Sequence, residues 1–179
     1  TQLWNLNVNH LRPVSDQFSM KYGLQVDHRQ IESNDRGDHD DLHLGVYAMG
    51  VYQPNPRWNV TASLRLDYDE NYDVELTPQA NISYVLPGVT LRASAGRTIR
   101  AANYTERYVS FNLENLTPGR NLGNPDLLAE TSWSEEIGAD FNLADNWQLK
   151  TTAFFRQSDN LIDYVSTNET EIPNNQRLQ

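Results

Sequence analysis

The chain has 179 residues, but only 38% of them are hydrophobic and its mean hydropathy is −0.68, whereas an ordinary packed domain is roughly 45–50% apolar. The 24 acidic residues outnumber the 14 basic ones and give a net charge of −10, which argues against nucleic-acid binding because that function needs a basic face. Aromatic residues make up 10% of the chain, too many for a disordered segment. A β-barrel with a polar interior would reconcile these numbers.

Other global features narrow the class further. The chain has no Cys, which excludes a disulfide framework and a thiolate metal site. No run approaches the roughly 18 apolar residues of a membrane helix. The sequence begins at Thr1 without a signal peptide or an initiator Met and ends in a polar stretch. We therefore expect a piece of a longer protein.

Apolar and polar residues alternate with period two along most of the chain, as in strands with one apolar face, and no amphipathic helix is expected. In chain order the alternating segments are residues 4–8, 18–26, 42–48, 58–68, 74–84, 89–95, 133–143 and 147–155. The pattern predicts an all-β fold, an antiparallel up-and-down meander of about eight long strands. Aromatic residues near the segment ends fit the interfaces of a membrane barrel, although a soluble β-sandwich would show the same alternation.

The alternation also predicts which side chains share a face. The apolar face should carry Val60, Ala62, Leu64, Ile82, Leu91, Ala93, Ile137, Phe141, Leu149 and Phe155. The opposite face should carry Thr61, Arg65, Asp67, Asn81, Arg92, Asp140, Lys150 and Arg156. In a barrel this second set would line the lumen, where we expect wall–plug hydrogen bonding rather than substrate contact.

Connections of two lengths alternate between the predicted strands. Short turns lie at residues 12–16, 53–57, 87–88 and 144–146. Longer polar connections lie at residues 29–41 and 100–132, and only the short connection at 69–72 breaks the pattern. Short turns at one end and long loops at the other are typical of outer-membrane barrels.

From Leu91 onward the sequence resembles TonB-dependent outer-membrane receptors, the family of siderophore and vitamin B12 transporters. The matching segments are residues 96–108 (GRTIRAANYTERY), 123–127 (GNPDL), 130–133 (ETSW), 136–140 (EIGAD) and 159–164 (DNLIDY). Ala102 and Ala129 stand where the family pattern has Pro. The order and spacing of the segments agree with the family pattern.

This resemblance implies that residues 1–179 are a partial barrel domain of a bacterial outer-membrane protein of about 22 strands with a plugged lumen. It implies active uptake of a metal chelate or cobalamin, with outer-membrane lipid, the plug, the remaining strands, TonB and a small nutrient as partners. No enzyme motif is present. A complete eight-stranded barrel with a structural or adhesive role and a soluble β-sheet binding module stay open as alternatives.

Two loops carry candidate sites. The acidic segment 32–41 offers carboxylates for Ca²⁺, a cation that prefers oxygen ligands, and the expected ligands are Asp35, Asp38, Asp40 and Asp41. A solvated acidic loop is the alternative. No other cofactor is expected. His39 and His43 are too far apart along a strand for a transition-metal site.

The long loop between the sixth and seventh predicted strands combines aromatic and guanidinium groups. Such groups suit the capture of a bulky anionic chelate by stacking and charge. The expected ligand-binding residues are Tyr104, Arg107, Tyr108, Phe111 and Arg120. Packing of the loop against its neighbours would use the same residues, so both interpretations stay open.

Overall fold

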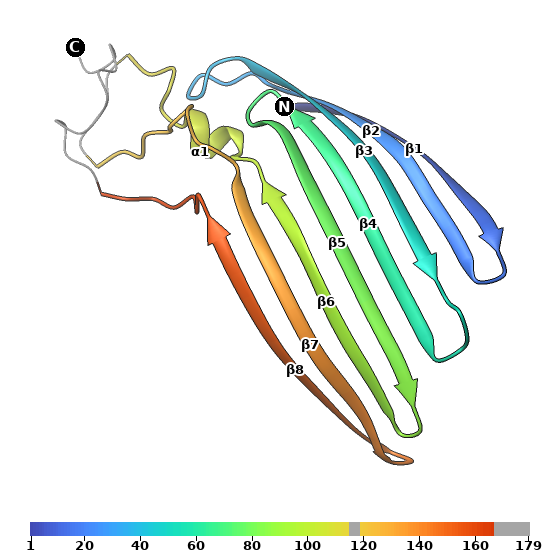
Figure 1. Ribbon diagram of the computed structural model, residues 1–179. Helices are drawn as coiled ribbons and strands as arrows, with labels where there is room; N and C mark the ends of the chain where they lie inside the picture. The colour runs from blue at the N-terminus through green and yellow to red at the C-terminus, as the bar shows by residue number, and fades with distance from the viewer. Residues whose placement is uncertain (115–118, 167–179) are drawn as a thin grey trace.

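The computed structural model describes residues 1–114 and 119–166, which form one open antiparallel sheet and a short helix (Figure 1). The elements are β1 (Gln2–Ser15), β2 (Phe18–Ile31), β3 (His39–Tyr52), β4 (Trp58–Asp69), β5 (Asp73–Leu86), β6 (Val89–Arg100), α1 (Tyr104–Tyr108), β7 (Glu130–Ala144) and β8 (Trp147–Asp159). The strands lie in sequence order, each hydrogen-bonded to the next. The predicted eight-stranded meander is confirmed.

The two faces of the sheet separate by chemistry, as the alternation predicted. One row of paired residues runs from Val60 through Ile82, Ala93 and Ile137 to Ala153. The neighbouring row runs from Thr61 through Asn81 and Ser94 to Glu136. Because residues paired across a ladder point to the same side, the register confirms the predicted division into an apolar face and a polar face.

The apolar face has no protein layer against it in the described part of the chain. Leu64 is 50% exposed, Ile137 is 65% exposed and Phe155 is 62% exposed. Among the described residues, the buried hydrophobic side chains are only Ile31, Ala102 and Ala129. An exposed apolar surface of this extent needs an apolar environment rather than water. None of the described helices has the length and apolar character to cross a membrane.

Connection length differs between the two ends of the strands (Figure 1). At one end, residues 16–17, 53–57, 87–88 and 145–146 make short turns. At the other end lie residues 32–38, the turn at 70–72 and the long β6–β7 connection. We call this second end the long-loop end.

Several strands extend further than the alternation indicated. Residues 12–15 were expected in a turn, but they continue β1 to Ser15, with a register shift between Pro13 and Ser15. Proline has no N–H to donate to a ladder, so a bulge on an edge strand tolerates it. The β2–β3 loop is correspondingly shorter than predicted, because β2 continues to Ile31 and β3 begins at His39.

The sheet does not close on itself. In the described chain β1 pairs with β2 alone and β8 with β7 alone, and every residue of β1 is exposed. A closed eight-stranded barrel would require β1 to pair with β8, so that alternative is wrong for this structure. The two unpaired edges leave backbone groups that further strands would satisfy.

Candidate functional site

The long β6–β7 connection starts with the five-residue helix α1, which the sequence analysis did not expect. The side chain of Asn103 accepts hydrogen bonds from the backbone N–H groups of Thr105 and Glu106 at 2.8 and 3.0 Å. The carboxylate of Glu106 accepts in return from the N–H of Asn103 at 2.8 Å. This capping box starts the helix, and the Asn103–Glu106 spacing is the sequence signal that would have predicted it.

Arg100, the last residue of β6, fixes the base of this connection. Its guanidinium donates to both oxygens of Glu106 at 2.9 and 3.0 Å and to Glu130 Oε2 at 2.5 Å. Glu130 is the first residue of β7. One cation therefore ties the helix to both strands that the loop connects.

Three of the predicted ligand-binding residues gather around one imidazole. Tyr108 stacks on His39, with ring centroids 3.6 Å apart. Phe111 meets both rings edge-on, at 5.4 Å from Tyr108 and 6.0 Å from His39, and Tyr104 lies 6.3 Å from both. Sequence reasoning missed His39, whose role depends on a contact between distant loops. Burial raises the pKa of Tyr104 and Tyr108, so both phenols are neutral.

Arg107, the fourth predicted ligand-binding residue, is buried. Its guanidinium donates to Asn71 Oδ1 in the β4–β5 turn and to the carbonyl of Pro125 at 3.4 Å. It also lies 3.6 Å from the carboxylate of Asp41 and 4.7 Å from the ring centroid of Tyr108. Arg107 thus ties helix α1 to β3, to the β4–β5 turn and to the returning part of its own loop.

Arg120, the fifth predicted residue, joins the β2–β3 loop. It donates to Asp35 at 2.7 Å and to the hydroxyl of Ser110 at 2.7 Å. The backbone N–H of Ser110, together with Arg120, holds the pKa of Asp35 below its usual value. The five predicted ligand-binding residues and two of the four predicted calcium ligands therefore meet in one group, which we call the loop cluster: Asp35, His39, Asp41, Tyr104, Arg107, Tyr108, Ser110, Phe111 and Arg120.

The four predicted calcium ligands do not converge. Asp35 pairs with Arg120, Asp41 with Arg107, and Asp40 with His28 at 3.5 Å, while Asp38 is exposed. Among residues 1–114 and 119–166, no three His, Cys, Asp or Glu side chains are arranged to hold a metal ion. The calcium site stays a prediction.

Below the loop cluster, charged residues on the polar face form cross-strand networks that the sequence did not reveal. His43 of β3 lies between Asp27 of β2 and Asp67 of β4, with nitrogen–oxygen distances of 2.9 and 2.8 Å. Asp67 also accepts from Arg65 at 2.8 Å. Arg29 of β2 pairs with the fully buried Asp69 at 2.5 Å. The networks tie β2, β3 and β4 together.

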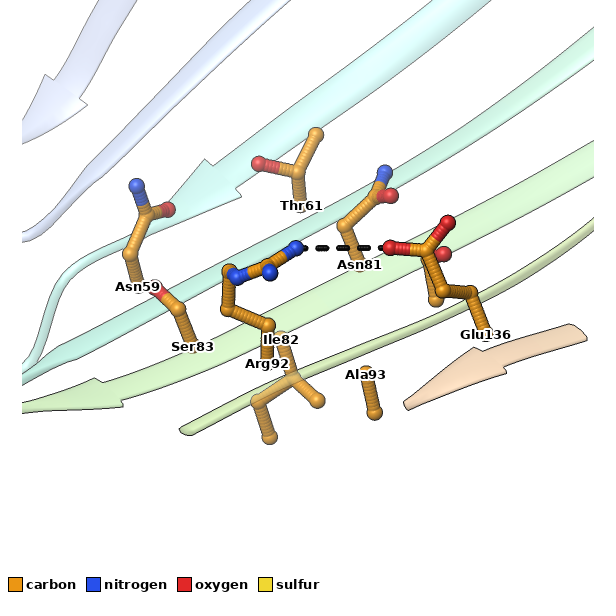
Figure 2. Close-up of a pocket in the computed structure, with 9 residues that line it drawn as sticks. Asn59, Thr61, Asn81, Ile82, Ser83, Arg92, Ala93 and Glu136 are labelled. Atoms are coloured by element: carbon orange, nitrogen blue, oxygen red, sulfur yellow. Dashed lines mark hydrogen bonds and ion pairs between the residues drawn. The ribbon is translucent and has the colours of Figure 1, made fainter. Parts of the chain in front are cut away.

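The polar face also has a hollow across β4 to β7, with a volume of about 250 Å³. It is lined by Asn59, Thr61, Asn81, Ser83, Ser94, Arg92 and Glu136, among others. Figure 2 shows the guanidinium of Arg92 reaching towards Glu136, at 3.3 Å. Arg92 also donates to Asp140 at 3.0 Å. Apart from Ile82 and Ala93, all the residues that line the hollow are polar or charged, which suits contact with another polar surface.

Glycines on neighbouring strands leave room for the guanidinium groups of Arg65 and Arg92 to lie flat on the polar face of the sheet. A Cβ on Gly45 would collide with the guanidinium of Arg65, and a Cβ on Gly138 would lie 2.9 Å from an Arg92 nitrogen. Each arginine therefore lies over the bare backbone of another strand, beside its carboxylate partner.

The family model described as TonB dependent receptor-like, beta-barrel, matches residues 3–178. The siderophore receptor PirA from Pseudomonas aeruginosa matches with a TM-score of 0.74 and 21% identity, over 87% of this chain and 31% of that chain. A search of curated proteins found no match.

Two further solved structures are similar. A mutant of the ferric enterobactin receptor PfeA from Pseudomonas aeruginosa has a TM-score of 0.67 and 20% identity, over 87% of this chain and 27% of that one. PirA from Acinetobacter baumannii has a TM-score of 0.65 and 18% identity, over 86% and 26%. The chain spans less than a third of the length of these proteins.

Proposed function

Because this chain belongs to the TonB-dependent receptor β-barrel family, we propose that it forms part of the wall and extracellular surface of a receptor that imports a ferric chelate. Family members are outer-membrane transporters rather than enzymes, so the chain lies in the bacterial outer membrane. The apolar face then contacts lipid and the polar face lines the lumen. Family membership also removes the soluble binding module as an alternative.

The observation that carries the proposed substrate class is the loop cluster at the long-loop end, the extracellular end of such a barrel. It combines stacked aromatic rings with two guanidinium groups. Arg120 leaves 45% of its side chain exposed, so it retains N–H groups for an anionic ligand. A metal chelate with aromatic or carboxylate groups would match this chemistry.

The relatives support a ferric chelate over cobalamin. The similar structures are named as receptors for siderophores and for ferric enterobactin. Their sequence identity to this chain is only 18–21%. The choice of substrate class within the family must therefore rest on the chemistry of the loop cluster. The plug, the remaining strands and coupling to TonB would be supplied by the rest of the receptor. The hollow around Arg92 is the surface that we expect the plug to contact.

The proposal is tested by uptake in cells whose own ferric-chelate and cobalamin receptors have been deleted. The full-length receptor is expressed and supplied with radiolabelled iron as catecholate, hydroxamate or citrate chelates, or with labelled cobalamin. We expect saturable uptake of one class of ferric chelate, abolished when TonB is deleted. Uptake of cobalamin alone, or of no tested compound, would contradict the proposed substrate class.

The loop cluster is tested in the same cells. Replacing Tyr104, Arg107 and Tyr108 together with Ala should weaken capture of the chelate, while the receptor still reaches the outer membrane. Asp126→Ala changes an exposed residue of the same loop and is the matched control. Unchanged binding and uptake by the triple variant would indicate that other loops or the plug recognise the chelate.

A further inference from the structure

The β6–β7 connection lies against the polar face of the sheet. Tyr104 donates from its hydroxyl to the backbone carbonyl of Arg29 at 3.0 Å, and Arg107 pairs with Asp41. Arg29 and Asp41 are paired across β2 and β3, two residues along from the paired Asp27 and His43, so they share the polar face with that pair. Both side chains therefore point to the lumen side. The connection folds inward, into the mouth of the barrel.

The connection also crosses several strands. It begins at Arg100 on β6 and reaches the β2–β3 loop, where the N–H of Asn112 donates to the carbonyl of Asp35 at 2.9 Å. Neighbouring strands are about 4.8 Å apart, so the four spacings from β6 to β2 amount to roughly 19 Å along the sheet. The contacts therefore link the end of β6 to the β2–β3 loop across the strands between them.

The contacts that hold the β6–β7 connection against the sheet and its loops are numerous and partly buried. Ser110 is fully buried, and Arg107 is 8% exposed. The stack of Tyr108 on His39, the pair of Arg120 with Asp35 and the bond from Arg107 to Asn71 attach the segment at separate points. Segments that open easily have few buried contacts and solvent-exposed hydrogen bonds. This segment has the opposite character.

We propose that residues 103–113 and 120–125 form a fixed strap inside the extracellular mouth, attached to the β2–β3 loop throughout binding and import. The ligand then passes beside the strap and does not displace it. The strap holds β2 and β6 at a set separation and narrows the mouth on this side. The part of this inference that concerns transport rests on the proposed function. Attachment of the strap can be measured without any ligand.

A disulfide between the strap and the β2–β3 loop tests this inference. A Cβ built on Gly37 would lie 3.9 Å from Cβ of Asn112, within the roughly 3.5–4.5 Å of natural disulfides. Gly37→Cys combined with Asn112→Cys therefore places two thiols at bonding distance, in a chain that has no other Cys. Because Gly37 has a φ of +85°, which strains other residues, the control pair Gly37→Ser with Asn112→Ser carries the same strain without a bond.

The first readout is formation of the bond in full-length receptor on intact cells, measured as the linked peptide by mass spectrometry. We expect nearly complete linkage under mild oxidation, equally with and without ferric chelate. The inference would be overturned if the bond did not form in cysteine receptor that reaches the outer membrane at the same level as the serine control. A large drop in linkage when the chelate is added would also overturn it.

The second readout is ferric-chelate uptake by the oxidised and the reduced cysteine variant. We expect the two rates to be the same. A rate that falls on oxidation and returns with reductant would mean that the strap must detach, which overturns the inference. If native, serine and reduced cysteine receptors all fail to import a ferric chelate, the proposed function fails, while linkage still decides whether the strap is attached.

Discussion

The ring of Tyr108 in helix α1 lies almost parallel to the imidazole of His39, the first residue of β3, with planes inclined by 10°. An aromatic pair of this kind contributes about 0.5–1.5 kcal/mol beyond the burial of its area. Tyr108→Leu should therefore speed hydrogen exchange at the amide of Asn112, whose N–H holds the strap to Asp35, and at the amide of Val109, whose N–H donates to Thr105 within the strap. Tyr108→Phe keeps the ring and should exchange at the native rate. Equal exchange in both variants would show that the stack does not hold the strap.

Asp35 should make attachment of the strap sensitive to acid only at low pH. The N–H of Ser110 and the guanidinium of Arg120 hold the pKa of Asp35 below its usual 3.8. A carboxylate with a lowered folded pKa stabilises the fold above its unfolded pKa, and this stabilisation is lost as pH falls through the folded value. The protection factor for hydrogen exchange at Ser110, which is the rate of an unfolded amide at the same pH divided by the measured rate, should therefore be constant from neutral to mildly acidic pH and should fall below the usual aspartate range.

The matched variant for this prediction is Asp35→Asn. The amide keeps the size of the side chain but carries no charge for Arg120, so the strap should exchange faster at neutral pH and lose its acid dependence. An acid transition that persists in Asp35→Asn would assign it to another group.

His43 should contribute to the stability of the barrel wall. Its side chain is 13% exposed, and it joins Asp27 and Asp67, whose side chains are 14% and 5% exposed. Removing a partner from buried polar groups costs roughly 1–3 kcal/mol. His43→Ala should therefore lower the denaturant midpoint of the full receptor in detergent micelles. His28→Ala is the control, because His28 is 43% exposed and contacts Asp40 only at 3.5 Å. Equal losses in both variants would contradict the role of the network.

Gly138 should be required for assembly of the wall. A Cβ at this position would lie 2.9 Å from the backbone carbonyl oxygen of Thr151 in β8 and equally close to Arg92. A backbone atom in a ladder has little room to shift, so Gly138→Ala should reduce the amount of folded receptor in the outer membrane. Ser94→Ala on the same face adds no atoms and should assemble normally. The amount of heat-modifiable, folded receptor on gels measures both.

The strands and their faces could be predicted because a period of two requires only local order in the sequence. Val60 and Thr61 differ in polarity, and each neighbour across four strands repeats that difference. The ends of strands were less predictable, because a polar segment such as residues 12–15 can continue a ladder at a sheet edge. Alternation indicates the face of a residue, but it does not indicate which residue of the next strand lies opposite.

The loop cluster and the His43 network could not be predicted from alternation, because they depend on which residues of different strands and loops lie opposite one another. Asp27, His43 and Asp67 come from three strands, and their contact depends on the register of two pairings. Arg120 and Asp35 come from two loops without any period. Residue type did identify the five side chains of the long loop as a group. It did not predict that His39 would join them or that Arg107 would be buried.

Gly45 and Gly138 have a consequence for the electrostatic field inside the barrel. Since Arg65 and Arg92 lie flat beside Asp67 and Asp140, each cation and its carboxylate form a dipole along the wall rather than a free charge aimed at the barrel axis. The field of a dipole decreases with distance more steeply than that of a single charge. An ion near the axis therefore experiences a weaker field from Arg65 and Arg92 than from two unpaired cations, and these charges act mainly on neighbouring strands.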